Sequence, residues 1–219
     1  MIDDPLGQAI SACDECFRQG ILSPARLEEW RTLRQRNRHL FRRFVPGDVR
    51  LLFVAESPPV SGCYFYRVPE WSQRGVPSAL FWETVRALGI APQGPRQYGR
   101  KEEYLLAFAA RGLAIVDAAR CPVNQLRDGE ARRVILNCSR FLKAELSTLR
   151  PAHIVVIKKT NEVLLSHLDV WGWGERLVSR QPLAFPVAGN QGRFREGIDA
   201  LRRERPEVAG LLGGHGSHE

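Results

Sequence analysis

Four short apolar runs constrain the fold of this chain more than any other feature of its sequence. They lie at residues 49–55, 113–116, 153–157 and 183–185. Each has the length of a strand, and runs without polar alternation are typical of strands buried on both faces of a parallel sheet. Helical patterns separate these runs, at about residues 78–88, 101–111, 130–149 and 160–167. The alternation predicts a three-layer α/β/α domain around a central four-stranded parallel sheet.

Length and hydropathy predict one domain. The chain has 219 residues, of which 44% are hydrophobic, and this is enough to bury a single core. We expect a domain over residues 1–210 that begins with a helical arm (1–46), and a flexible tail at 211–219. No apolar run reaches the ~20 residues that a membrane span requires. The acidic start of the chain is not followed by the apolar segment of a signal peptide, so we expect a cytoplasmic monomer that does not associate with membranes.

The charge of the chain favours a polyanionic partner. The net charge is +8, and all but four of the 32 Lys and Arg residues are arginine. Arginine binds phosphate in a bidentate manner and is weakly hydrated, so a surface rich in arginine suits nucleic acid. A genome of high GC content also enriches arginine without a functional reason. The charge therefore indicates DNA or RNA as the partner without distinguishing them.

Four cysteines have the spacing of metal ligands. Cys13 and Cys16 form a C-x2-C pair, and Cys121 and Cys138 follow far along the chain, whereas Cys63 stands apart. Four thiolates of this kind hold an iron–sulfur cluster or a structural zinc ion, and either would fasten the N-terminal arm to the rest of the fold. Free thiols that merely pack in a core are the third interpretation. Because we expect a reducing compartment, disulfides are not predicted.

Polar and aromatic residues follow three of the apolar runs, where a parallel sheet binds its ligands. Glu56 and the aromatic segment 64–66 follow the first run, Asp117 follows the second, and the loop with Asn190 and Gln191 follows the fourth. Together they predict a pocket that stacks and hydrogen-bonds a planar base. Each feature also has a structural interpretation: Glu56 as a cap, Asp117 paired with Arg120, and the aromatic rings as core.

The order of these motifs resembles the iron–sulfur uracil-DNA glycosylases, also called family 4. Glu56-Ser57-Pro58-Pro59 is similar to the G-E-x-P-G motif of that family. The C-x2-C arm, Ser61-Gly62 before an aromatic residue, Arg120-Cys121-Pro122, and Cys138 opening a helix occur in the family's order. The resemblance implies a uracil-DNA-glycosylase-like fold and a [4Fe-4S] cluster held by Cys13, Cys16, Cys121 and Cys138. Zinc remains the minor alternative.

The sequence departs from the family at the residues that read the base. Asp117 stands where the family has an asparagine, and Phe185-Pro186-Val187 stands where it has His-Pro-Ser. An amide suits the O4 acceptor and the N3–H donor of uracil, whereas an ionised carboxylate only accepts hydrogen bonds. A carboxylate suits the exocyclic amine of cytosine, although a close bidentate fit requires a proton on the base N3 or on the carboxyl. The sequence therefore predicts a cytosine-type base.

The resemblance also implies roles for other residues. Glu56 would orient a water or stabilise the positive charge that develops on the sugar. Phe65 would stack on the extruded base, with Tyr64 or Tyr66 as alternatives, and Gly62 lies in a segment of small residues that leaves room at C5. Asn190 and Gln191 are candidate donors to the base O2. Arg193, Lys158 and Lys159 are candidate contacts to DNA phosphates.

These expectations combine into one predicted function. We expect a monofunctional DNA glycosylase that flips and excises a cytosine-type base, modified at C5 as in glucosylated hydroxymethylcytosine, and leaves an abasic site. Phages carry such bases, so phage defence is the expected setting. Ordinary uracil repair is one alternative, and a catalytically silent iron–sulfur module that binds DNA is another.

Overall fold

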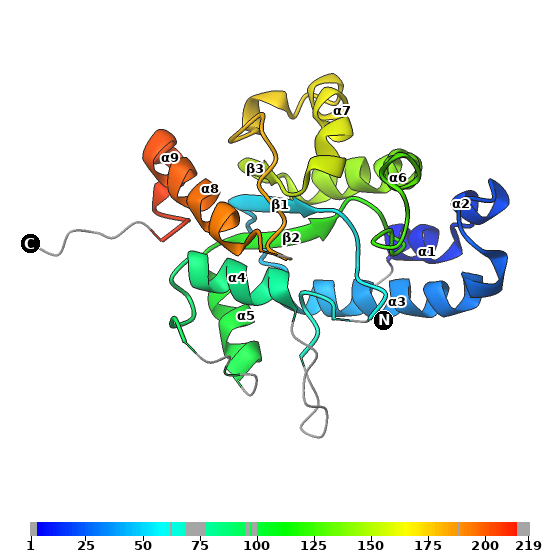
Figure 1. The fold of residues 1–219 in the computed structure, drawn as a ribbon, viewed down its shortest axis with the longest axis horizontal. Coiled ribbons are helices and arrows are strands. Elements are labelled where there is room, and N and C mark those ends of the chain that lie inside the picture. Colours follow the sequence, from blue (N-terminus) through cyan, green and yellow to red (C-terminus); the bar gives the residue numbers. More distant parts are fainter. Residues whose placement is uncertain are drawn as a thin grey trace, which may run out of the picture.

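A parallel sheet of three strands lies at the centre of the fold (Figure 1). In this computed structural model, which describes residues 4–61, 63–68, 78–94, 97, 100–187 and 189–213, the strand order is β2-β1-β3. The strands span Leu51–Ala55 (β1), Leu113–Asp117 (β2) and His153–Val156 (β3). All residues of β1 and β2 are buried, as unbroken apolar runs predict. The predicted α/β class and parallel sheet are confirmed.

The predicted fourth strand is wrong. Within the described residues the sheet has three strands, and Leu183 forms only an isolated parallel bridge with Ile157. The Leu183 N–H donates to the Val156 carbonyl at 2.8 Å, and the Lys158 N–H donates to the Leu183 carbonyl at 2.7 Å. Pro182 and Pro186 flank this run, and because proline lacks an N–H, the ladder cannot extend. The run therefore lies beside the end of β3 without becoming a strand.

Helices cover both faces of the sheet, which gives three layers (Figure 1). α3, α4 and α5 lie on one side and α6 and α7 on the other, as right-handed crossovers between parallel strands require. The helices span Pro5–Ala12 (α1), Glu15–Arg18 (α2), Leu27–Phe44 (α3), Ala79–Ala87 (α4), Lys101–Ala110 (α5), Asp128–Leu149 (α6), Leu165–Val170 (α7), Gln191–Glu204 (α8) and Pro206–Ala209 (α9). Short 3-10 turns lie at Pro24–Arg26 (η1), Lys159–Leu164 (η3) and Gly174–Arg176 (η4).

The C-terminal part of the chain is more ordered than the sequence suggests. The loop at 190–193, for which an ordinary helix N-terminus was the structural alternative, does begin a helix, and α8 packs against α4 through a face that includes the buried Phe194 and Ile198. Leu211 and Leu212 are buried, so the packed body extends past the predicted boundary at residue 210. Residues 214–219 of the predicted tail lie outside the described residues. Among the described helices, none combines the length and the apolar character that crossing a membrane requires.

The N-terminal arm is fastened to the body by buried polar contacts. Arg34 on α3 donates through Nη1 to the carbonyls of Ile10 (2.8 Å) and Cys13 (2.6 Å) in α1 and just after it. Arg38, one turn further along α3, pairs with Glu145 on α6 at 2.9 Å. These contacts connect α1, α3 and α6, and they place the arm next to the carboxyl end of β2.

Tyr66 holds the segment after β1 against the outer edge of the sheet. Its hydroxyl accepts a hydrogen bond from the Ile115 N–H at 2.8 Å and donates one to the Ile115 carbonyl at 3.2 Å. Both backbone groups belong to β2, and Tyr66 is almost fully buried. One side chain therefore satisfies two backbone groups of β2, which pairs with β1 and has no second neighbouring strand among the described residues.

We expect Tyr66→Phe to lower the free energy of unfolding by about 1–3 kcal/mol, because it leaves a buried N–H and a buried carbonyl without partners. Urea denaturation measures this change. Tyr104→Phe is the matched control: the Tyr104 hydroxyl bonds the exposed Gln97, which water can satisfy, so its loss should stay within about 0.5 kcal/mol. Equal losses in the two variants would contradict the role assigned to Tyr66.

Candidate functional site

Two carboxylates lie at one edge of the sheet. Asp117 ends β2, and Glu56 directly follows β1, whose last residue, Ala55, pairs with Asp117. Two further hydrogen bonds of 2.8 Å, from Ala118 to Ala55 and from Ala119 to Glu56, keep the two chains together beyond the strands. Parallel strands deliver their carboxyl ends to the same edge, and this is why residues far apart in the sequence come together here.

Glu56 is buried and held by two donors. The Lys158 ammonium forms an ion pair with Oε2, and the Thr160 hydroxyl donates to Oε1. Each carboxylate oxygen keeps a lone pair for a further donor, because an ionised carboxylate accepts at about four sites. The predicted role of Lys158 at a DNA phosphate does not match this position, since its charge is already paired with Glu56. Lys158 instead fixes the orientation of the carboxylate.

The backbone at Lys158 is strained. Its φ angle is +74°, a region that residues with a side chain rarely adopt. The Lys158 N–H is bound to the Leu183 carbonyl, and its ammonium lies 5.7 Å from the centre of the Phe185 ring. The bridge from the fourth apolar run thus holds Lys158 in the conformation that reaches Glu56. Strain of this kind is concentrated at functional sites, where the surrounding structure imposes it.

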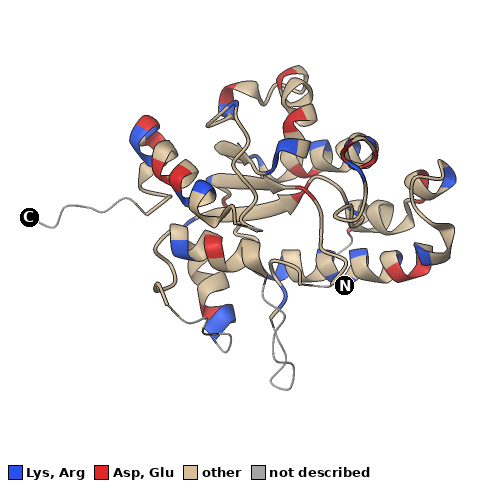
Figure 2. Cartoon of the chain, viewed as in Figure 1, with Lys and Arg blue, Asp and Glu red and all other residues tan. Residues whose placement is uncertain are grey.

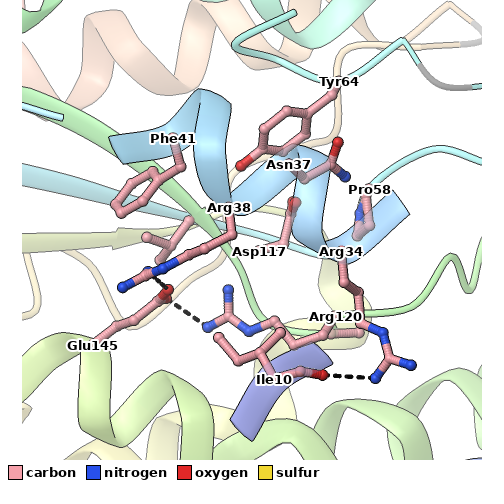
Figure 3. A pocket seen from close by; sticks show the side chains of 12 residues that line it. Ile10, Arg34, Asn37, Arg38, Phe41, Pro58, Tyr64, Asp117, Arg120 and Glu145 are labelled. Carbon is pink, nitrogen blue, oxygen red and sulfur yellow. Dashed lines mark hydrogen bonds and ion pairs between the residues drawn. The ribbon is translucent and has the colours of Figure 1, made fainter. Parts of the chain in front are cut away.

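Asp117 faces a small cavity of about 30 Å³ between α1, α3, α6 and the chain after β1 (Figure 3). Its walls include Asn37, Tyr64, Pro58 and Arg120. The carboxyl of Asp117 points toward the side chains of Asn37 and Tyr64. A volume of this size holds about two waters, which is less than a pyrimidine ring needs. A base would therefore have to displace part of the cavity wall.

The Asp117 carboxyl has no hydrogen bond and no ion pair within the residues that the structure describes. Burial raises its pKa to about 7; Arg120 opposes this shift, while the charges of Glu145 and Glu56 add to it. The predicted alternative, a pair between Asp117 and Arg120, does not form. The Arg120 guanidinium is instead bound to Glu145 at 2.5 Å. Near neutral pH the carboxyl is accordingly divided between its protonated and ionised forms.

The three predicted aromatic residues have different surroundings. Phe65, the expected stacking residue, lies in the core with its ring centre 5.3 Å from those of Phe81 and Phe108. Tyr66 is bound to β2, and only Tyr64 lines the Asp117 cavity. Of the three predicted aromatic residues, Tyr64 is therefore the one that a ligand in this cavity could contact, and Phe41 of α3, which the sequence did not single out, also lines the cavity. Gly62 lies outside the described residues.

The loop after the fourth apolar run does not reach the Asp117 cavity. Asn190 precedes α8 and Gln191 begins it, and neither lines that cavity. Arg193, also on α8, is exposed, as is Lys159 at the start of η3. The two basic residues lie on the surface, and the contact of the two amides with a base stays a prediction.

Arginines are distributed over the surface together with carboxylates. Figure 2 shows Lys and Arg on α3, α6 and α8 with Asp and Glu among them. A groove of about 390 Å³ between α3 and the chain after β1 has Arg36, Ser61 and Arg67 in its lining, together with the carboxylate of Glu29. Burial and the charge of Arg67 lower the pKa of Arg36. The sequence pattern gave no sign that these two guanidinium groups lie close together.

The four predicted ligand cysteines come from four segments that meet beside α6. Cys13 follows α1, Cys16 lies on α2, Cys121 follows β2, and Cys138 lies on α6. All are free thiols. A hydrogen bond with Cys138 lowers the pKa of Cys16 to about 7 and raises the pKa of Cys138. Burial raises the pKa of Cys121 to about 12; Arg34 opposes this shift, and the charges of Cys16 and Cys13 add to it. The fold therefore brings the C-x2-C pair to the other two cysteines.

Nitrogen donors surround these sulfurs. Asn137 donates to Cys16 Sγ at 3.5 Å, Arg140 to Cys13 Sγ at 3.4 Å, and the Arg120 N–H to Cys138 Sγ at 3.4 Å. Such donors stabilise thiolates, so the chemistry of this set fits a group held by four thiolates. Within the described part of the chain, however, no three His, Cys, Asp or Glu side chains are gathered closely enough to hold a single metal ion.

Comparison with known proteins gives a match to a family model. Residues 41–188, more than half of the chain, match a family model described as the Uracil DNA glycosylase superfamily. Neither a curated protein nor a solved structure matches the chain. The matched segment contains β1, β2, β3 and both carboxylates, and it begins after Asn37 and the C-x2-C pair.

We expect Asp117→Asn to stabilise the protein above pH 7. The folded-state pKa of Asp117 is raised, so the stability that this group contributes is complete below its unfolded value and is lost as the pH rises through about 7. The amide removes this loss, and because one pKa unit corresponds to about 1.4 kcal/mol, we expect a gain of about 1–4 kcal/mol at pH 8 and little change at pH 4.

Urea denaturation at the two pH values measures this difference. Asp48→Asn, at an exposed turn position, is the control and should behave alike at both. An Asp117→Asn variant that is less stable than the natural protein at pH 8 would show that the carboxylate has a partner in solution.

Proposed function

The chain belongs to the uracil DNA glycosylase superfamily, and on this premise we propose that it is a monofunctional DNA glycosylase that excises a cytosine-type base. The observation that carries the choice of base is Asp117, a buried carboxyl at the end of β2 that has no partner among the residues that the structure describes. We further propose that the base is modified at C5, as in glucosylated hydroxymethylcytosine. Because phages carry such bases, phage defence in the cytoplasm is the proposed setting.

Asp117 favours cytosine through its hydrogen-bonding groups. The ionised carboxylate accepts from the exocyclic amine of cytosine, but it offers no donor to the O4 of uracil. A mismatched base would leave buried polar groups unpaired, which costs about 1–3 kcal/mol for each group. The raised pKa adds a pH dependence to this choice. The protonated carboxyl offers a donor and an acceptor, as an amide does, and so can bind uracil below pH 7.

Glu56 suits the chemical step. The glycosidic bond breaks with positive charge on the sugar, and a fixed carboxylate stabilises this charge without reorganising. Lys158 and Thr160 hold Glu56 in one orientation while leaving an acceptor site on each oxygen. Glu56 is therefore the proposed catalytic carboxylate, which stabilises the sugar cation or orients the attacking water. Lys158 is its positioning residue.

The proposed DNA contacts are phosphates beside this edge of the sheet. Arg36 in the groove next to Ser61 is the proposed phosphate contact closest to this edge, and the exposed Lys159 and Arg193 are further candidates. Arginine and lysine contacts to phosphate position a protein on DNA without reading sequence. The groove and Glu56 flank the same chain segment after β1, so a strand bound in the groove would bring its nucleotides close to the site.

Two other functions have specific support. Uracil repair is favoured by the protonated form of Asp117, which resembles the amide of the family. A catalytically silent module that binds DNA is favoured by the small cavity and by the pairing of Glu56 with Lys158. The three functions predict different products from the same set of DNA substrates, so one assay separates them.

We expect the purified protein to release cytosine-type bases from DNA and to leave alkali-labile sites. Oligonucleotides that contain one uracil, cytosine, 5-hydroxymethylcytosine or glucosylated hydroxymethylcytosine are incubated with the protein and treated with alkali, and strand breaks are counted. Breaks at the C5-modified cytosines are expected at pH 8, where Asp117 is ionised. Uracil release should appear below pH 7 and fall about tenfold for each pH unit above it, because its donor is the protonated carboxyl.

Glu56→Gln is the control for a contaminating glycosylase, because it keeps the shape of the site and removes the charge. It should abolish breaks while leaving affinity for DNA unchanged. Breaks at uracil alone, with equal rates at pH 6 and pH 8, would reject the cytosine proposal in favour of uracil repair. Absence of breaks in every substrate would favour the silent module.

We also propose that Cys13, Cys16, Cys121 and Cys138 hold a [4Fe-4S] cluster. The thiolate character of Cys16 and the nitrogen donors to three of the sulfurs support this proposal. The proposed role is structural, since the ligands connect the arm to the loop that follows Asp117.

Anaerobic purification should give a brown protein with about four irons per chain and absorbance near ~400 nm. Cys138→Ser should lose the iron and the colour, because it removes one of the four ligands. Cys63→Ser is the matched control and should keep both, since Cys63 lies apart from the other four. A colourless natural protein with about one zinc per chain would replace the cluster with a structural zinc site.

A further inference from the structure

Asn37 presents an unpartnered amide to the cavity that Asp117 faces. It lies on α3 and is 7% exposed, and neither Oδ1 nor Nδ2 has a hydrogen-bond partner within the described residues. Figure 3 shows its side chain next to Tyr64, with the Asp117 carboxyl directed toward both. A buried amide without a partner costs about 1–3 kcal/mol, so its presence requires an explanation.

The position of Asn37 on α3 makes the amide unusual. The inward face of the helix is formed by Trp30, Arg34, Asn37, Phe41 and Phe44, at the spacing of a buried helical stripe. Arg34 is the other polar member, and it donates to the carbonyls of Trp30, Ile10 and Cys13. Asn37 has no such role, although an apolar side chain at this position would fill the core at lower cost.

Asn37 supplies what Asp117 lacks. The carboxylate accepts from the exocyclic amine of a cytosine-type base but cannot donate to the ring N3 or to O2, which are both acceptors. The amide nitrogen of Asn37 is a donor and faces the same cavity. The two side chains together therefore match the donor and acceptor pattern of cytosine without an added proton.

We propose that Asn37 is a base-reading residue that donates a hydrogen bond to N3 or O2 of the extruded base while Asp117 accepts from its amine. This inference rests on the proposed glycosylase function and specifies its recognition site. The arm thereby contributes to base choice, in addition to carrying two of the proposed cluster ligands. In the absence of DNA, waters in the cavity would satisfy the two side chains, and the edge of the base would replace them.

The test uses Asn37→Leu and Asn37→Ala in the full chain, with kcat/KM measured on DNA containing uracil, cytosine or glucosylated hydroxymethylcytosine. Both variants should lose at least about tenfold in kcat/KM on the preferred cytosine-type base, and the ratio of that rate to the uracil rate should fall. Leucine fills the cavity and alanine enlarges it, so a loss common to both comes from the missing amide and not from steric closure.

Thr84→Val is the matched control, because Thr84 Oγ1 is also buried without a partner but lies on α4 and does not line the cavity. It should keep kcat/KM within about twofold, and thermal denaturation should show all three variants folded. Unchanged kcat/KM and base preference in Asn37→Leu and Asn37→Ala would overturn the inference and leave the amide bound to internal water only. A natural protein that releases none of the bases would overturn the glycosylase proposal itself, and with it this inference.

Discussion

The buried carboxylate of Glu145 is the interaction on which the arrangement of the site depends. Glu145 lies on α6, is 3% exposed, and binds Arg38 of α3 at 2.9 Å and Arg120 of the loop after β2 at 2.5 Å. It thereby connects three segments around the Asp117 cavity. A buried ion pair contributes little net stability, but removing one partner leaves a charge without compensation, typically at a cost of about 3–5 kcal/mol. Glu145 also engages the Arg120 guanidinium, so Arg120 forms no ion pair with Asp117. Burial raises the pKa of Asp117, Arg120 opposes this shift, and the charges of Glu145 and Glu56 add to it.

The sequence predicts the three strands of the sheet correctly, but it wrongly predicts the fourth apolar run as a strand. The first three apolar runs are strands because a parallel sheet buries both faces, and this leaves a pattern that is visible without any tertiary information. The fourth run has the same local composition, but Pro182 and Pro186 limit it to a single bridge. The flanking prolines were visible in the sequence and indicate a truncated strand. The packing of α8 on α4 was less visible, since a charged amphipathic stretch is consistent with a helix or a solvated tail.

At the site, too, the sequence predicts which residues lie near each other but not where every side chain points. Glu56 and Asp117 were predictable as neighbours because topology alone brings the ends of parallel strands together. The direction of a side chain is decided by packing: Phe65 turns into the core and Tyr64 toward the cavity, although the two are adjacent in the sequence. Lys158 likewise read as a surface cation, and only the fold places it on Glu56. Asn37 could have been noticed as a polar break in the apolar stripe of α3, but its proximity to Asp117 could not.

The unpartnered groups of this fold are informative because they conflict with stability. Folded chains satisfy their buried polar groups or replace them with apolar ones, and exceptions concentrate where a ligand completes the set. Here a carboxyl and an amide from segments 80 positions apart in the chain face one cavity, and both lack partners within the described residues. Two buried polar groups without partners that face the same cavity are harder to attribute to imperfect packing than one such group. The two side chains are also complementary, because the Asp117 carboxylate accepts hydrogen bonds and the Asn37 amide also donates them. A base with hydrogen-bond donors and acceptors along one edge requires such a pair.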